Sequence, residues 1–258
     1  MGIPEPRVIA VIPARYASTR LPGKVLADIG GRPMIQRVVE RVARARTVSR
    51  VLVATDDERV YDCVRGFGAE VVMTPEDIPS GTDRVARAVS EMDTEIVLNV
   101  QGDEPFIDPD AVDAVAGLLT EDTAVPMATL IRRIDNIEEL VSPQTAKVVM
   151  DEEGFALYFS RSPIPFFRDI AKEDWISNQA YYRHVSVYGF RKDFLMRFAS
   201  WAPARLESLE KLEQLRVLEK GFRIKTAVTT SDSFGVDTPE DLERARRRAA
   251  EMGDAGRR

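Results

Sequence analysis

Short apolar runs alternate with amphipathic stretches through the first half of the chain, and this alternation constrains the fold more than any other feature. The apolar runs are rich in Val and Ile and cover residues 7–13, 50–54, 69–73 and 95–100. Amphipathic patterns typical of helices cover residues 32–46, 57–66, 82–92 and 109–119. Short buried strands separated by helices form parallel sheets with helices on both faces. The first half therefore predicts an α/β fold of the Rossmann-like, doubly wound type.

The second half predicts further strands with less regular connections. Strand patterns cover residues 124–132, 146–151, 155–160, 184–190 and 223–228. Irregular proline-containing segments, such as residues 162–168, separate several of them. We expect a mixed extension of the sheet, with a smaller appended lobe at about residues 124–204 inside a single domain of residues 1–250. Residues 251–258 are expected to form a disordered tail.

Two helices are predicted near the end of the chain, over residues 205–220 and from residue 238 to about residue 250. The first is rich in leucine, and its leucines are Leu206, Leu209, Leu212, Leu215 and Leu218. A spacing of three drifts around a helix by roughly 60° per step, so these leucines predict core packing and no coiled-coil seam. Two of the three glutamates Glu207, Glu210 and Glu213 are expected on the solvated surface.

Composition excludes several classes of protein and of site. The 258 residues carry 36 basic and 42 acidic side chains, a net charge of -6, which argues against nucleic-acid or membrane partners. A small anionic substrate in a local basic pocket stays possible. One cysteine and one histidine exclude a Cys/His zinc site, so any metal is expected on carboxylates. The sequence has neither an apolar run of ~18 residues nor a signal-peptide pattern, which predicts a cytoplasmic protein.

A basic loop follows the first predicted strand, at the sheet edge where open parallel sheets bind their ligands. Residues 14–24 read ARYASTRLPGK and place Arg15, Arg20 and Lys24 beside two hydroxyl groups. Three cations in one loop favour a polyphosphate ligand, because charge-assisted hydrogen bonds to phosphate are strong. The loop matches neither the P-loop nor the G-x-G-x-x-G pattern. The alternative is a solvated basic loop without a ligand.

Two carboxylates at the same edge predict a metal site. Asp103 follows the fourth strand in NVQGDEP, and Asp237 precedes the last helix in GVDTPEDL. Neither is needed as a helix cap, because Asp108 caps the helix after Asp103, while Thr238 and Asp241 form a capping box after Asp237. Mg²⁺ accepts two protein carboxylates together with phosphate oxygens and water. The alternative for Asp103 is a capping role.

Three further positions carry two interpretations each. The segment from Ser80 to Arg84 opens a helix, where backbone N–H groups can bind a base or phosphate, or where Ser80 acts only as an ordinary N-cap. His184 lies in an apolar strand, where a lone histidine is more often a packed, hydrogen-bonded residue than a catalyst. Arg161 is suited either to clamp a carboxylate or to form a surface ion pair.

Six segments in this order resemble the 3-deoxy-manno-octulosonate (Kdo) cytidylyltransferase family: VIPARYASTRLPGK, SGTDR, NVQGDEPFI, YFSRSPIP, LESLEKLEQLRVLEKG and GVDTPEDLERAR. The resemblance runs from about residue 7 to residue 248. It implies a nucleotide-diphosphosugar transferase fold, a homodimer, and Mg²⁺-dependent transfer of CMP from CTP to Kdo. Pyrophosphate leaves, and the product serves lipopolysaccharide biosynthesis.

The resemblance also implies roles for single residues. The implied nucleotide-binding residues are Ala14, Arg15, Ser18, Arg20, Lys24, Ser80, Gly81, Thr82 and Gln101. The implied sugar-binding residues are Gln101, Arg161, His184, Tyr188, Glu213 and Gln214. Asp103 and Asp237 would bind Mg²⁺, and together with Arg15 and Lys24 they form the implied catalytic group.

Two departures from the family pattern keep the substrate open. Ile78 stands where the family often has histidine, and Ser186 stands where many members have glycine. Use of 8-amino-Kdo or of a sialic acid is therefore the alternative reaction. A non-catalytic nucleotide-binding protein on this fold is a third hypothesis, and the presence of all three loop cations and both carboxylates argues against it. Residues 168–181 match the family only loosely and receive no role.

Overall fold

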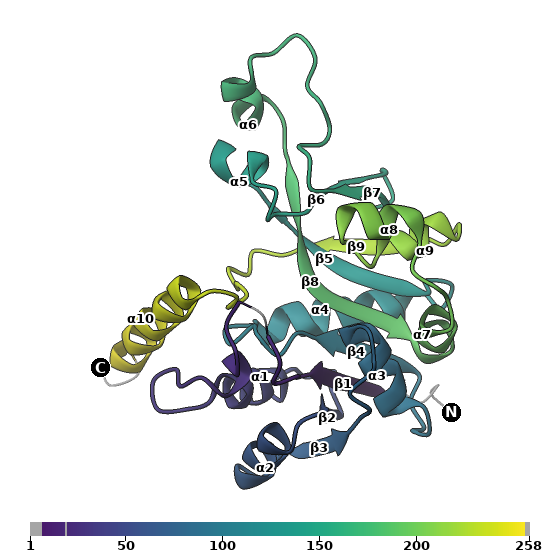
Figure 1. The fold of residues 1–258 in the computed structure, drawn as a ribbon. Coiled ribbons are helices and arrows are strands. Elements are labelled where there is room, and N and C mark those ends of the chain that lie inside the picture. The colour runs from purple at the N-terminus through teal and green to yellow at the C-terminus, as the bar shows by residue number, and fades with distance from the viewer. Residues whose placement is uncertain (1–6, 19, 256–258) are drawn as a thin grey trace. The chain divides into compact units, whose positions relative to one another are not determined.

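The computed structural model describes residues 7–18 and 20–255, without the side chains of residues 253–255. It divides the chain into two compact units: Met1–Asp113 with Asp232–Arg258, and Ala114–Ser231. The second unit is larger than the predicted lobe of residues 124–204, because its last strand pairs in register with its first. Both units can be followed by colour in Figure 1.

The first unit contains a parallel sheet with strand order β3-β2-β1-β4. Its strands are β1 (Val8–Pro13), β2 (Arg50–Thr55), β3 (Glu70–Met73) and β4 (Ile96–Val100), and their pairings are parallel. The four strands predicted in the first half are therefore confirmed. The chain adds β2 and β3 on one side of β1 and then returns to place β4 on the other. The loops that follow β1 and β4 thus meet where the strand order reverses, the usual ligand position in open α/β sheets.

The helices of the first unit bury one apolar face each. They are α1 (Met34–Val42), α2 (Glu58–Gly66), α3 (Gly81–Val89) and α10 (Pro239–Ala255), and a short 3-10 turn, η1, covers Lys24–Leu26. Helix α4 (Pro109–Glu121) spans the boundary between the units. Leu242, Ala245 and Ala249 of α10 pack with Met34 and Phe106. Helix α10 continues to Ala255, further than predicted, so the expected tail is helical from Glu251 to Ala255. Residues 256–258 lie outside the described part.

The second unit contains a mixed sheet. Its strands are β5 (Met127–Arg133), β6 (Lys147–Met150), β7 (Ala156–Ser160), β8 (Tyr182–Arg191) and β9 (Ile224–Val228). Strand β8 is antiparallel to β5 and β6, whereas β9 is parallel to β5. The five strands predicted in the second half are confirmed. The helical elements are α5 (Ile137–Val141), η2 (Lys172–Asp174), α6 (Trp175–Asn178), α7 (Lys192–Ala199), α8 (Arg205–Glu210) and α9 (Leu215–Glu219). Of these, α5, η2, α6 and α7 were not anticipated.

The single leucine-rich helix predicted over residues 205–220 is wrong. Lys211 adopts a left-handed conformation, with φ of 55°, which ends α8 before α9 begins at Leu215. One straight helix cannot bury leucines that drift around its axis, and the break turns Leu212 and Leu215 inward. Leu209 stays 69% exposed, so its predicted core position is also wrong.

The glutamates of this segment are not plain surface residues, contrary to the expectation for two of the three. Glu210 accepts hydrogen bonds from the Ser160 hydroxyl (2.7 Å) and the Arg161 backbone N–H (2.8 Å). Glu207 accepts two hydrogen bonds from the Arg216 guanidinium, at 2.8 and 2.5 Å. Arg216 is buried, and its guanidinium lies 4.3 Å from the centre of the Phe198 ring. This two-point ion pair ties α8 to α9 across their break.

Arg216→Met is expected to lower the free energy of unfolding by about 3 kcal/mol, because it leaves the Glu207 carboxylate largely buried without its counter-charge. Urea unfolding followed by circular dichroism measures this change. Arg205→Met is the matched control, since Arg205 is exposed at the start of α8. Equal stability of the two variants would contradict the importance of the pair.

Candidate functional site

A cavity of about 300 Å³ opens in the first unit at the carboxyl ends of β1 and β4. Its lining includes nine of the residues to which the resemblance assigns a role: Arg15, Ser18, Arg20, Lys24, Ser80, Gly81, Gln101, Asp103 and Asp237. Ala14 and Thr82 are buried and do not line it. The cavity thus collects polar groups from four separate segments of the chain.

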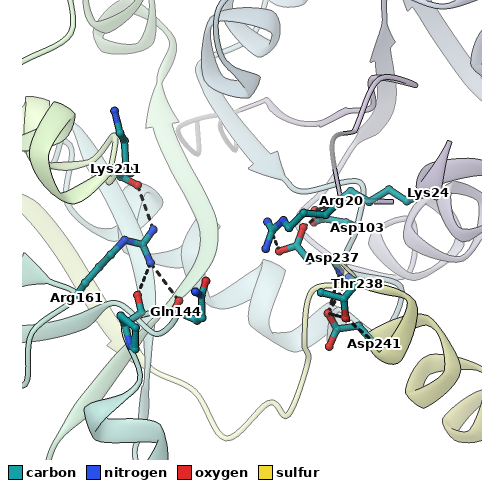
Figure 2. Close-up of polar contacts among 10 residues, drawn as sticks. Arg20, Lys24, Asp103, Gln144, Arg161, Lys211, Asp237, Thr238 and Asp241 are labelled. Carbon is teal, nitrogen blue, oxygen red and sulfur yellow. Dashed lines mark hydrogen bonds and ion pairs between the residues drawn. The ribbon is translucent and has the colours of Figure 1, made fainter. Parts of the chain in front are cut away.

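Lys24 stands between the two carboxylates of this cavity. Its Nζ donates to Asp103 Oδ2 at 2.6 Å and to Asp237 Oδ1 at 2.8 Å, and Arg20 pairs with the other oxygen of Asp237 at 3.0 Å (Figure 2). Burial alone lowers the pKa of Lys24, but the charges and hydrogen bonds of Asp103 and Asp237 outweigh burial and raise it above its ordinary value. The ammonium therefore stays protonated at neutral pH and joins residues that lie 79 and 213 positions away in the chain.

The loop that carries Lys24 is shaped by a tight turn. Gly23 has a φ of 69°, and its N–H donates to the Tyr16 carbonyl at 3.1 Å. A Cβ atom at Gly23 would lie 3.0 Å from the Tyr16 ring, so both the conformation and the contact require glycine. The guanidinium of Arg59 lies 3.4 Å from the centre of the same ring. The basic loop is thus folded back on itself and supported by α2.

The two carboxylates are placed by the backbone around them. The Asp103 carbonyl accepts from the N–H of Val236, at 2.9 Å, which holds the residue before Asp237 beside Asp103. A side chain at Gly102 would lie 2.9 Å from the Pro13 carbonyl oxygen, so only glycine lets this loop approach the end of β1. Thr238 and Asp241 bond each other reciprocally, which confirms the predicted capping box (Figure 2). The Asp237 backbone N–H also donates to Asp241, at 3.1 Å, whereas the Asp237 carboxylate takes no part in the box.

A chain of side-chain hydrogen bonds orients Gln101 at the cavity. The buried Asn99 donates to the Thr82 hydroxyl and accepts from Gln101 Nε2, both at 3.0 Å. Because Nε2 is committed to Asn99, Oε1 of Gln101 is left to accept a hydrogen bond from a ligand. Ser80 is the N-cap of α3, as its ordinary interpretation predicted, and bonds the N–H of Asp83 at 3.1 Å.

The sequence interpretation gave no role to Arg84, which also lines the cavity. Its guanidinium is buried and bonds Asp56 at 2.6 Å, the Pro75 carbonyl at 3.3 Å, and the Thr74 hydroxyl. These bonds make it a support of α3. Its position in the SGTDR segment was the available signal, but only the fold reveals its partner 28 residues away.

Three residues of the implied sugar-binding set lie together in the second unit. The rings of His184 and Tyr188 have centres 5.1 Å apart, and the Tyr188 hydroxyl donates to Gln214 Oε1 at 3.1 Å. Burial raises the pKa of Tyr188, and the charge of Glu213 adds to this effect. Gln214 is buried, and within the described residues its Nε2 has no hydrogen-bond partner. This cluster leaves one buried amide donor for a polar ligand.

His184 is a packed, hydrogen-bonded histidine, as its position in an apolar strand indicated. Its Nε2 lies 2.9 Å from the hydroxyl of Thr129, which itself donates to the Val187 carbonyl at 2.8 Å. Because the hydroxyl has a single hydrogen, Nε2 of His184 is the donor in their contact. Burial, and secondarily the charge of Arg183, lower the pKa of His184 to about 3. The imidazole is therefore neutral at physiological pH.

Arg161 braces backbone segments and forms no ion pair in the described structure. Its side chain donates to the carbonyls of Glu210 (2.7 Å), Pro143 (2.8 Å), Gln144 (3.3 Å) and Lys211 (3.4 Å), part of which Figure 2 shows. The surface ion pair considered for it is thus wrong. A two-pronged grip on a carboxylate would require it to give up some of these bonds, since guanidinium has five N–H donors.

The buried Lys147 continues this network. Its ammonium donates to the carbonyls of Ser142 (2.7 Å), Thr145 (2.6 Å) and Arg161 (2.5 Å), so all three hydrogens are used. Burial, followed by the charge of Arg161, lowers its pKa. Lys147 and Arg161 together fix the backbone on both sides of Arg161.

The donor set of the first unit fits a hard divalent cation. Asp103 and Asp237 both reach the single Nζ of Lys24, so their oxygens converge on one point. No cluster of three or more His, Cys, Asp or Glu residues occurs in the described part of the chain. A metal held here would therefore need ligands from water or from a substrate, which Mg²⁺ accepts.

Across the described residues, no helix is long and apolar enough to cross a bilayer.

A parallel α/β sheet whose open edge joins a basic loop to two carboxylates suits a nucleotidyltransferase. The family model described as cytidylyltransferase matches residues 9–225. A 3-deoxy-manno-octulosonate cytidylyltransferase of Geobacter sulfurreducens is 54% identical over 92% of this chain and 97% of its own length. That of Syntrophotalea carbinolica is 53% identical, over 92% and 96%. The chain therefore belongs to the cytidylyltransferase family, in the branch of the 3-deoxy-manno-octulosonate cytidylyltransferases.

Solved structures agree with this assignment. A CMP:2-keto-3-deoxy-manno-octonic acid synthetase complexed with CTP superposes with a TM-score of 0.90 at 42% identity, covering 95% of this chain and 99% of that one. A 4-diphosphocytidyl-2C-methyl-D-erythritol synthase from Anaerococcus prevotii shares the fold at 11% identity, with a TM-score of 0.61. The predicted α/β fold of the nucleotide-diphosphosugar transferase type is confirmed.

The neutral state of His184 predicts a specific pH dependence of stability. The pKa of His184 is about 3 in the fold and about 6.5 in the unfolded chain, so the unfolded chain binds more protons between these values. The contribution of the neutral His184 imidazole to the free energy of unfolding is fully present above pH 6.5 and is lost as the pH falls toward 3. Between pH 7 and pH 5 this loss is about 2 kcal/mol.

Urea unfolding of wild type and His184→Gln at pH 7 and pH 5 measures this effect, which the variant lacks. We expect the stability difference between the two proteins to shrink by about 2 kcal/mol at pH 5. The chain has one histidine, so its NMR resonance can be followed directly. A folded protein whose histidine titrates near pH 6.5 would contradict the burial argument.

Proposed function

We propose that this protein transfers CMP from CTP to Kdo and releases pyrophosphate. The observation that carries the proposal is the Lys24 ammonium held between Asp103 and Asp237 at the mouth of the parallel sheet. It is supported by a fold that matches a CTP-complexed synthetase with a TM-score of 0.90. In this reaction a bond forms between the anomeric oxygen of Kdo and the α-phosphorus. The bond from that phosphorus to the bridging oxygen of pyrophosphate breaks, and the hydroxyl proton goes to solvent.

The cavity residues of the first unit suit the nucleotide half of this reaction. Phosphoryl transfer depends mainly on positioning and on stabilising charge, which fixed cations provide. We assign Arg15, Arg20 and Lys24 to the phosphates of CTP. Gln101, whose Oε1 is held available by its bond to Asn99, and the first turn of α3 at Ser80 and Gly81 are assigned to the nucleoside.

Asp103 and Asp237 are the residues assigned to hold Mg²⁺. Their convergence on one point supports the assignment, as does their hard oxygen chemistry. Bound there, the ion would act as a Lewis acid toward phosphate oxygens and lower the charge repulsion against the attacking hydroxyl. Lys24 bonds both carboxylates. A metal ion bound there would therefore either displace the Lys24 ammonium or share the carboxylate oxygens with it.

The second unit is assigned to the sugar. Gln214 offers a buried donor, and Tyr188 and Glu213 surround it. His184 has a pKa of about 3 and is therefore a weak base at neutral pH, so we assign it a positioning role. Arg161 is proposed to hold the segment that leads into Glu213 and Gln214 through its bonds to the carbonyls of Glu210 and Lys211.

Assembly into a homodimer is also part of the proposal. In the second unit Leu157, Phe166, Leu209 and Val228 expose 60%, 75%, 69% and 60% of their surface, and an interface between two copies would cover apolar side chains of this kind. A mass of twice 28.9 kDa by light scattering would support the homodimer.

A cytoplasmic location stays a prediction.

Asp103→Asn is expected to lower turnover by an amount equal to about 3–4 kcal/mol of transition-state stabilisation, similar to the loss of one preorganised electrostatic group. Pyrophosphate release at saturating CTP and Kdo measures the effect. Asp62→Asn, on the exposed face of α2, removes the same charge away from the cavity and is the control. Turnover within about fivefold of wild type in Asp103→Asn would reject the metal assignment.

Substrate preference is tested by pyrophosphate release from CTP and Mg²⁺ with Kdo, 8-amino-Kdo and N-acetylneuraminate. We expect Kdo to give the strongest release. Preference for the amino sugar would reassign the substrate and point to Ser186 and its neighbours. Silence with all three, despite CTP binding, would favour the non-catalytic hypothesis and contradict the proposed function.

A further inference from the structure

A second, smaller cavity of about 110 Å³ lies in the first unit, beside α1 and apart from the carboxylates that hold Lys24. Four of the residues that line it are arginines: Arg32, Arg37, Arg41 and Arg44. Glu40 is the single acidic residue in the lining, and Arg32 forms an ion pair with it. Three positive charges therefore remain around a space several times the roughly 30 Å³ that one water occupies in the liquid.

Two of the guanidinium groups around this cavity, those of Arg37 and Arg41, are held in place by backbone carbonyls. Arg37 donates to the carbonyls of Ile29 (2.5 Å) and Gly30 (3.2 Å), and Arg41 Nε donates to the Ile107 carbonyl. These bonds use neutral acceptors and leave both terminal nitrogens of Arg41 for another partner. The Arg44 side chain has no hydrogen bond or ion pair with any described residue, and its backbone N–H donates to the Arg41 carbonyl at 3.1 Å. Arg37 and Arg41 are thus fixed by backbone carbonyls, and the carboxylates whose charges act on them, Glu40 and Asp28 for Arg37 and Asp108 for Arg41, form no ion pair with them in the described residues.

Burial is the main effect on these arginines, and neighbouring cations add to it. Burial lowers the pKa of Arg41; the charge of Asp108 opposes this effect, while the charges of Arg44, Arg248 and Arg37 reinforce it. Burial and the charge of Arg32 lower the pKa of Arg37, and the charges of Glu40 and Asp28 oppose them in part. Like charges that lie this close are usually separated or paired, and an anion in the cavity would relieve their repulsion.

We propose that this cavity is a binding site for a phosphate-type oxyanion, held by Arg41 and Arg44 with Arg37 beside them. Guanidinium groups match phosphate oxygens through paired N–H donors, which favours this ligand class over halide. Phe106 and Met252 supply the apolar wall of the cavity. Phe106 follows Asp103 by three residues, so the ligand would contact the same loop that carries the proposed metal ligand. The site does not depend on the proposed reaction.

Methionine methyl NMR provides a reporter inside the cavity. The chain has 8 methionines, and the Met252 signal is assigned as the one missing from Met252→Leu. Orthophosphate and pyrophosphate are titrated separately against sodium chloride of equal ionic strength. We expect a saturable shift of Met252 with at least one phosphate and no such shift with chloride. A smaller dissociation constant for pyrophosphate would identify the reaction product as the ligand, and the reverse would identify free phosphate.

Variants separate this cavity from the CTP cavity. Arg44→Glu is expected to weaken binding by at least about tenfold, because it reverses one charge of the site. Arg44 is exposed and its side chain makes no bond to the described residues, so the variant is expected to fold. Arg65→Glu makes the same charge change on α2 and should leave binding unchanged, and Lys24→Gln should leave the Met252 shift intact. Absence of a saturable shift, or an equal shift in Arg44→Glu, would overturn the proposal.

Discussion

The ion triad of Lys24, Asp103 and Asp237 is the interaction on which the first unit depends. One ammonium closes three segments that are far apart in the chain around a single point. Without the Lys24 ammonium, the two carboxylates would repel each other. Without the carboxylates, the partly buried ammonium would have no counter-charge and would destabilise the fold. The same electrostatic balance makes the point suitable for a metal ion, because a different cation can satisfy the same oxygens.

The second unit relies on a different principle, in which cations are satisfied by backbone carbonyls. Lys147 and Arg161 together reach carbonyls of the 142–145 loop, Arg161 itself and the end of α8. Such bonds fix loop backbone that forms no regular hydrogen bonds of a helix or sheet. A loop-rich region can position side chains accurately in this way. His184 and Tyr188 lie on the regular strand β8, so the unit combines a rigid strand with braced loops.

Most of the strands and the main helices of the parallel sheet were predictable, because buried strands and amphipathic helices leave periodic patterns. The free carboxylates were also predictable, since Asp108 and the Thr238–Asp241 pair already satisfy the helix ends. The break at Lys211 was not, because a left-handed lysine has no local signal in a leucine-rich segment. The partners of Arg84, Arg161 and Arg216 could not be predicted either. The sequence does not distinguish an arginine that is solvated from one that is ion-paired or bonded to backbone carbonyls.

The sequence by itself determined the order of the strands and of the main helices of the parallel sheet. It also determined the basic loop, the capping of α4 and α10 and the family of the chain, because each of these depends on residues close together or on motifs in fixed order. Only the tertiary structure decided which oxygens Lys24 binds, which arginines are already committed and which stay available around the second cavity. The physical reason is that charge–charge and hydrogen-bond partners are chosen by distance in space. Residues that lie 213 positions apart then become nearest neighbours.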